Sequence, residues 1–381
     1  MEILASMGGT ASWLLGYVIP FLFVLTIVVF FHELGHFWVA RRAGVTIVAF
    51  SIGFGPELVG FYDRHGTRWK ISAIPLGGYV KFLGDDNAAS TPDRAQLEQM
   101  SEADRRGSFF HKPVAARAAI VAAGPIANFI LAIVIFSVLF MTVGRPVMTP
   151  LVDAVQPGSA AEKAGFQPHD LILSIDGTPI ETFSDMQRIV SVSADEPLRI
   201  EIDRDGQHLT LTATPDRREI TDRFGNVQRL GVLGISRSTG GGEIKTQTYG
   251  PVQAVTMATR EVWFIVDRTF SYIGGVVTGR ESADQLGGPI RIAQVSGQVA
   301  TFGMAALLQL AAVLSVSIGL LNLFPVPLLD GGHLLFYAIE ALRGRPLSER
   351  AQEVGFRIGL ALVLMLMLFA TWNDILNISK S

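Results

Sequence analysis

The chain has 381 residues, 49% of them hydrophobic, and a formal net charge of only −3 at pH 7. The mean hydropathy of +0.38 argues against an ordinary soluble protein, and the small charge argues against nucleic acid as a partner. The absence of cysteine excludes disulfides, thiolate metal sites and a cysteine nucleophile. Any metal would therefore be held by His, Asp, Glu or Asn.

Four apolar runs are long enough to span a membrane, which takes about 20 residues. We predict a first transmembrane helix within residues 1–45, a second at 115–143, a third within 301–340 and a fourth at 354–374. The first run follows no basic segment and ends at no small-residue cleavage site, so we interpret it as a retained helix rather than a signal peptide.

Basic residues predict the orientation of these spans. Lys and Arg follow the first span, precede the second and lie between the third and fourth, whereas the tail before Trp13 has none. Because basic loops stay in the cytoplasm, we expect residues 41–114 and 335–354 to be cytoplasmic. Both termini and residues 144–300 would then lie on the far side.

The first span ends in "FHELGHFW" (30–37). His32 and His36 are four residues apart and share one face of a helix, and HExxH is the spacing by which two imidazoles bind zinc while the glutamate serves as general base. Ionisable groups within a membrane are costly, and a bound cation compensates them. The motif favours His32 and His36 as ligands and Glu33 as base. The alternative is two buried histidines and a glutamate near the interface.

Residues 46–84 have the composition of strands. "RWKISAIPLGGYVKF" (68–82) alternates and is rich in β-branched and aromatic residues, and "YDRHGTRW" (62–69) supplies a turn. We predict a membrane-associated β-hairpin or small sheet here. Gly77 and Gly78 could let a substrate backbone approach closely, or could form a plain turn. Residues 85–114 are predicted to be a cytoplasmic loop with a short helix.

Residues 150–215 are predicted to form a separate α+β module of about PDZ size. "PGSAAEKAG" (157–165) is typical of a short helix ending near Gly165, and Ser184 is a candidate N-cap of a second helix. Asp-Gly pairs at 176–177 and 205–206 predict tight turns between strands. Peptide binding, gating and a passive spacer are all possible roles for this module.

Residues 216–300 are interpreted as a linker. Aromatic and charged residues recur at helical spacing over 251–280, which predicts an amphipathic helix at the membrane surface.

The third span contains "NLFPVPLLDGGH" (322–333). Catalytic zinc needs a third protein ligand and an open position, and Asp330 is the candidate, with His333 as its rival. Pro325 and Pro327 must kink or break the helix ahead of it. Asn322 could hydrogen-bond a substrate backbone or bond across helices.

These motifs together resemble a known family. "HELGH", "AAGPIANFILA" (122–132) and "NLFPVPLLDGG" resemble the site-2 proteases, the M50-type intramembrane zinc metalloproteases. "SIGFGP" (51–56), "IPLGGYVKF" (74–82) and the PDZ-sized module are similar to the RseP-like bacterial group. Since 216–250 is too short for a second module, the chain resembles a single-PDZ member.

The resemblance implies a polytopic α-helical membrane protein with four transmembrane helices, a membrane-associated β-hairpin and an inserted α+β PDZ-like domain. It implies one zinc ion held by His32, His36 and Asp330, with Glu33 as base and Asn322 helping to hold substrate.

The implied function is an intramembrane zinc metalloendopeptidase of the bacterial inner membrane. It would cut within or near the transmembrane segment of single-span proteins, such as anti-sigma factors or remnant signal peptides, in regulated intramembrane proteolysis. The PDZ-like domain would be extracytoplasmic and the active site near the cytoplasmic side. Two alternatives stay open: a non-catalytic adaptor that binds peptides through its PDZ module and has a structural metal closed by four ligands, and a metalloprotease acting on soluble loops.

Overall fold

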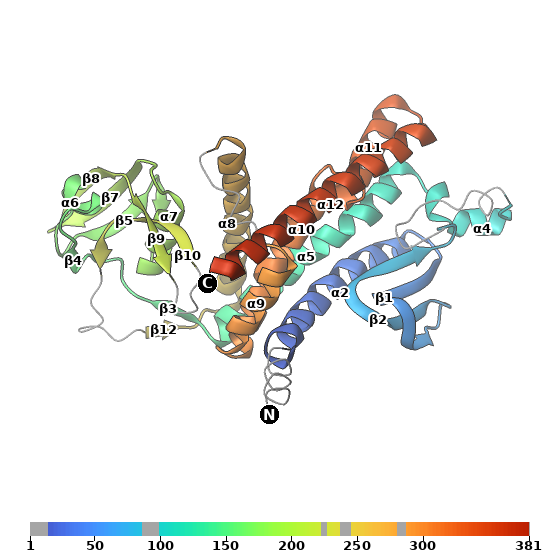
Figure 1. Ribbon diagram of the computed structural model, residues 1–381, viewed down its shortest axis with the longest axis horizontal. Helices are drawn as coiled ribbons and strands as arrows, with labels where there is room; N and C mark the ends of the chain where they lie inside the picture. Colours follow the sequence, from blue (N-terminus) through green and yellow to red (C-terminus); the bar gives the residue numbers. More distant parts are fainter. Residues whose placement is uncertain (1–13, 86–98, 222–226, 237–244, 280–286, 381) are drawn as a thin grey trace. The chain divides into compact units, whose positions relative to one another are not determined.

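The computed structural model describes residues 14–85, 99–221, 227–236, 245–279 and 287–380. The chain forms two compact units, one of residues 1–139 and 251–380 and one of residues 140–250 (Figure 1). Among the described residues, four helices are long and apolar enough to cross a membrane, which agrees with the four predicted spans. They are Leu15–Arg42, Val114–Thr142, Met304–Leu323 and Arg350–Leu376.

The first unit is mainly helical. Its helices are η1 (Leu14–Val18), α2 (Ile19–Arg42), α4 (Glu102–Gly107), η2 (Phe109–His111), α5 (Val114–Thr142), α8 (Pro251–Val277), α9 (Pro289–Ala300), α10 (Met304–Leu323), α11 (Asp330–Arg343) and α12 (Glu349–Lys380). Helix α2, which carries the HExxH motif, packs against α9 and α10 as well as against the hairpin that follows it.

The predicted β element is the antiparallel pair β1 (Ile47–Tyr62) and β2 (Arg68–Phe82). Ile52 pairs with both Ile71 and Gly78, so the first half of β1 lies between the two halves of β2. Residues 78–82 therefore form the outer strand of the described sheet, where the Phe82 amide donates to Asp85 Oδ2 at 2.7 Å. The stacked rings of Phe50 and Trp69 pack against Phe37 of α2 and anchor the sheet on that helix.

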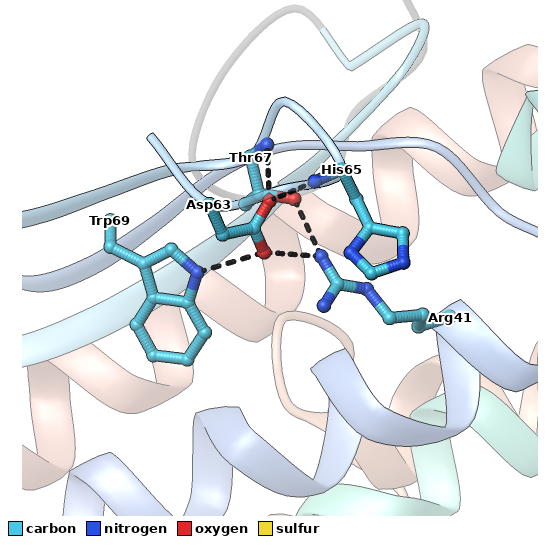
Figure 2. A network of polar contacts seen from close by, with 5 residues as sticks. All are labelled: Arg41, Asp63, His65, Thr67 and Trp69. Atoms are coloured by element: carbon cyan, nitrogen blue, oxygen red, sulfur yellow. Dashed lines mark hydrogen bonds and ion pairs between the residues drawn. The ribbon is translucent and has the colours of Figure 1, made fainter. Parts of the chain in front are cut away.

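A polar network holds the hairpin turn at the end of α2 (Figure 2). Asp63 Oδ2 accepts hydrogen bonds from Arg41 at 2.5 Å and from the Trp69 indole at 3.2 Å. Its Oδ1 accepts from the backbone amides of His65 and Thr67. Partial burial alone would raise the pKa of Asp63, but the hydrogen bonds from Arg41 and the two amides outweigh it and lower the pKa.

The third predicted span, residues 301–340, is two helices rather than one. Helix α10 ends at Leu323 and α11 begins at Asp330. Proline cannot donate the helical hydrogen bond, and Pro325 and Pro327 lie in the break, as predicted. Leu328 has a φ of 99°, which no helix accommodates.

The second unit contains the predicted α+β module. A four-stranded sheet has the order β6 (Thr178–Pro179), β5 (Leu171–Ile175), β7 (Leu198–Arg204) and β8 (Gln207–Ala213). Helices α6 (Ala160–Ala164) and α7 (Phe183–Val192) accompany it. The core contains fully buried side chains, among them Ile172, Ile175, Met186, Ile200 and Ile202.

Both predicted Asp-Gly turns are confirmed, since all four residues have positive φ between paired strands. As predicted, α6 ends near Gly165, which caps the helix in the left-handed conformation. The N-cap of α7, however, is Thr182 and not Ser184. Thr182 and Asp185 bond each other's backbone amides in a capping box, which satisfies two amides at once.

The predicted linker over 216–300 differs from the structure. Residues 216–250 contain strands β9 (Asp216–Thr221), β10 (Val227–Val232), β11 (Ile235–Ser236) and β12 (Lys245–Gln247) and belong to the second unit. Strand β11 pairs with β4 (Ala154–Val155), and β12 pairs with β3 (Arg145–Val147). The predicted helix over 251–280 is α8, whereas α9 was not predicted.

Candidate metal centre

The two histidines of the HExxH motif face each other across one turn of α2. Their Nε2 atoms are 3.3 Å apart, and the two side chains are only 12% and 13% exposed. The i, i+4 spacing of a continuous helix produces this arrangement.

Asp330 brings a carboxylate to the same point from the far end of the sequence. It is the first residue of α11, and its Oδ2 lies 3.2 Å from His32 Nε2 and 3.5 Å from His36 Nε2. This oxygen is buried and has no hydrogen-bond partner. The break between α10 and α11 thus places a carboxylate oxygen beside the two imidazole nitrogens.

The three atoms fit a divalent cation. Ligands about 2.0–2.1 Å from a tetrahedral zinc ion lie about 3.3–3.4 Å from one another, and the three separations here are 3.2, 3.3 and 3.5 Å. Two imidazole nitrogens and one carboxylate oxygen also suit zinc chemically. Among the described residues, this trio is the group of possible metal ligands whose atoms come together.

Glu33 lies next to this trio in the helix, with Gly78 of β2 against it. A Cβ added to Gly78 would lie 3.1 Å from Glu33 Cγ and 2.7 Å from the Ser51 carbonyl oxygen. Gly78 therefore allows the edge of the sheet to approach the predicted base closely. Gly77, with a φ of 109°, has the ring of Phe54 beside it.

The two other residues singled out in the third span lie differently. His333 is one turn further along α11, where its ring packs near those of Tyr337 and Phe356, and it is not part of the trio. Asn322 is half-buried near the end of α10.

Helix α5 supports the site through residues to which the sequence analysis gave no role. The Ile120 carbonyl oxygen is 2.9 Å from His36 Nδ1. A Cβ on Gly124 would overlap the His36 ring, and Asn128 meets His32 Nδ1 at 3.3 Å. Asn128 could have been recognised from the sequence as a candidate for a functional role, because it is a polar residue within an apolar span.

An ion pair joins α5 to α11. The Arg117 guanidinium is 2.6 Å from Glu340 and lies over the ring of Tyr337, and both charged side chains are 14% exposed. This contact fixes the helix that begins with Asp330 against the helix that supports both histidines.

Comparison with known proteins is consistent with this geometry. The family described as Peptidase family M50 matches residues 20–366, which is most of the sequence. The chain belongs to peptidase family M50.

Relatives of this M50 peptidase are similar over nearly their whole length. A protein of Rhizobium meliloti named "Putative zinc metalloprotease R01501" is 56% identical over 362 residues, covering 95% of this chain and 97% of the relative. Metalloprotease MmpA of Caulobacter vibrioides is 43% identical over 380 residues, covering 94% and 95%. The regulator of sigma-E protease RseP of Salmonella typhimurium is 34% identical over 452 residues, covering 93% and 97%.

The enzyme is accordingly a zinc metalloprotease of the M50 family. Among solved structures, the PDZ domain of an SdrC-like protein of Listeria monocytogenes matches 23% of this chain and 83% of that domain. At 16% identity and a TM-score of 0.18, that match does not assign the fold of the second unit, so a PDZ-like module stays a prediction.

Proposed function

We propose that this metalloprotease is an intramembrane zinc endopeptidase with His32, His36 and Asp330 as ligands and Glu33 as general base. The observation that carries the proposal is the tetrahedral spacing of the three candidate ligand atoms. Two of them belong to α2, which is long and apolar enough to span a membrane, and the third belongs to the first residue of α11, just after the break that follows α10. Three ligands rather than four leave a position for water, which is typical of catalytic zinc and not of a structural site.

The chemistry follows from the positions of these residues. A zinc ion held by the trio would lower the pKa of water and polarise the peptide carbonyl. Glu33 would accept the proton of the attacking water and pass it to the leaving nitrogen. Asn322, near the end of α10, would hydrogen-bond the substrate backbone.

A substrate helix must unwind first, because its peptide groups are hydrogen-bonded to each other. Strand addition along residues 78–82 would hold an unwound segment, since these residues form the outer strand of the described sheet and Gly78 lies against Glu33. Gly77 and Gly78 would then allow the close backbone approach.

The proposed substrates are single-span membrane proteins, such as anti-sigma factors and remnant signal peptides. The name of the Salmonella relative, regulator of sigma-E protease, supports this class. We propose that the enzyme lies in the bacterial inner membrane with both termini and the second unit outside. The active site would open near the cytoplasmic side, because Arg41 and Arg42 end α2 about two turns after the motif.

The test is Glu33→Gln, which keeps the shape of the side chain and removes the base. The purified variant should retain zinc as the wild type does and lose cleavage of a reconstituted single-span substrate by at least about 100-fold. Mass spectrometry of the wild-type products should locate the cut within or near the span. Full cleavage by Glu33→Gln would end the proposal. A zinc-loaded wild type that binds substrate without turnover would favour the adaptor, and a cut far from the span would favour action on soluble loops.

A further inference from the structure

Helix α5 contributes no ligand, yet it passes both histidines with one face. Ile120, Gly124 and Asn128 are spaced four residues apart and therefore lie on the same side of the helix. The backbone carbonyl of Ile120 contacts His36, and the side-chain amide of Asn128 contacts His32. Gly124 has no side chain and so leaves room for the two histidine rings.

The contact with Ile120 determines the tautomer of His36. A backbone carbonyl oxygen can only accept a hydrogen bond, so Nδ1 of His36 carries the hydrogen, 2.9 Å from that oxygen. The lone pair of the ring is then on Nε2, which faces Asp330. This is the arrangement in which an imidazole binds a cation through Nε2.

The contact with Asn128 has two forms, related by a 180° rotation of the amide group. In the first form, which the structure shows, Asn128 Nδ2 faces His32 Nδ1 at 3.3 Å, and Asn128 Oδ1 is buried without a hydrogen-bond partner. In this form Nε2 of His32 would carry a hydrogen. In the rotated form Oδ1 accepts from Nδ1–H, and the lone pair is on Nε2, between His36 and Asp330.

We propose that Asn128 is a positioning residue: when the site holds its metal, the amide oxygen of Asn128 accepts the Nδ1 hydrogen of His32 and keeps Nε2 free for the metal. This inference rests on the proposed function, because only a cation at the trio requires that tautomer.

The surroundings of Asn128 suit this role. The residue is fully buried, and Ser315 Oγ of α10 donates to its backbone oxygen at 2.9 Å. Gly319 lies one turn further along α10, so close that an added Cβ would be 3.1 Å from Asn128 Cβ. Contact with α10 therefore fixes the backbone and Cβ of this residue while the amide group stays free to present either end to His32.

The test compares Asn128→Asp with Asn128→Leu in the full-length protein. A carboxylate at this position accepts the Nδ1 hydrogen without rotation, whereas leucine has similar volume and no acceptor. Zinc content would be measured by plasma mass spectrometry during titration with a chelator. Loss of a residue that orients a metal-binding histidine typically weakens metal affinity 10–100-fold. We expect that loss for Asn128→Leu and near wild-type retention for Asn128→Asp.

The control is Ser137→Ala, which removes another buried polar group of α5 whose hydroxyl bonds its own helix at Ile133. It should retain zinc. If Asn128→Leu does not fold, Asn128→Ala removes the same acceptor. Equal zinc retention by wild type and the leucine or alanine variant would overturn the inference, as would equal loss in the aspartate variant. A wild type that binds no zinc would instead refute the proposed function, and the inference with it.

Discussion

Gly124→Ala is the smallest change that should disable the centre. A Cβ at this position would lie 2.5 Å from His36 Cε1 and 3.0 Å from His32 Cε1. Carbon atoms in normal contact are about 3.5–4.0 Å apart, so the His36 ring must move by about 1 Å. Ligand distances in a metal site agree with the standard values to within about 0.2 Å. The displacement is about five times that margin.

We therefore expect Gly124→Ala to weaken zinc binding roughly 100-fold and to reduce cleavage by a similar factor, because a 1 Å misplacement costs about that much. Zinc retained against a chelator and cleavage of a reconstituted single-span substrate are the two measurements. The matched control is Gly274→Ala in α8, where an added Cβ meets nothing within 4 Å.

In a helix interior, glycine is less stable than alanine by about 0.5–1 kcal/mol. Gly274→Ala should therefore be neutral or slightly stabilising, with zinc binding unchanged. Wild-type zinc retention in Gly124→Ala would refute the reasoning, because the histidine rings would then not occupy the positions described. A loss in both variants would indicate a general effect of added methyl groups on the protein.

Two further predictions concern ion pairs. Arg117→Met leaves Glu340 buried and unpaired and should lower the free energy of unfolding by about 3 kcal/mol. The double variant Arg117→Met/Glu340→Leu should lose less stability than either single variant. Thermal unfolding in detergent measures these losses, and additive losses would contradict the prediction. Asp63→Asn should lower the melting temperature by about 2–4 °C at pH 7. Because hydrogen bonds lower the pKa of Asp63, the charged form is favoured on folding, so this difference should shrink as the pH falls below about 4. A difference that grows in acid would contradict the role assigned to Arg41.

The sequence made His32, His36 and Asp330 candidate ligands, with His333 as a rival of Asp330, because ionisable residues stand out in apolar runs and are costly within a membrane. The spacing of the two histidines was informative as well, and the structure brings the first three residues together. The Asp-Gly turns were predictable because tight hairpin turns require positive φ, which few residue types adopt without strain.

The supporting residues could not be assigned in this way. Ile120 acts through a backbone carbonyl and Gly124 through a missing Cβ, and neither function has a sequence pattern of its own. The division of the third span depends on the conformation of Leu328 as well as on the prolines. The double pairing of Ile52 depends on how β2 bends, which alternation of residue types does not encode.

The separation of the three proposed ligands along the chain has a consequence for biosynthesis. His32 and His36 leave the ribosome early, whereas Asp330 is made only after both earlier spans and the whole second unit. A nascent chain that ends before α11 lacks the carboxylate. Since metal affinity depends on a complete set of preorganised ligands, the growing polypeptide would have only two of the three proposed ligands for most of its synthesis. Under the proposed function, hydrolysis would then be impossible until translation is almost finished.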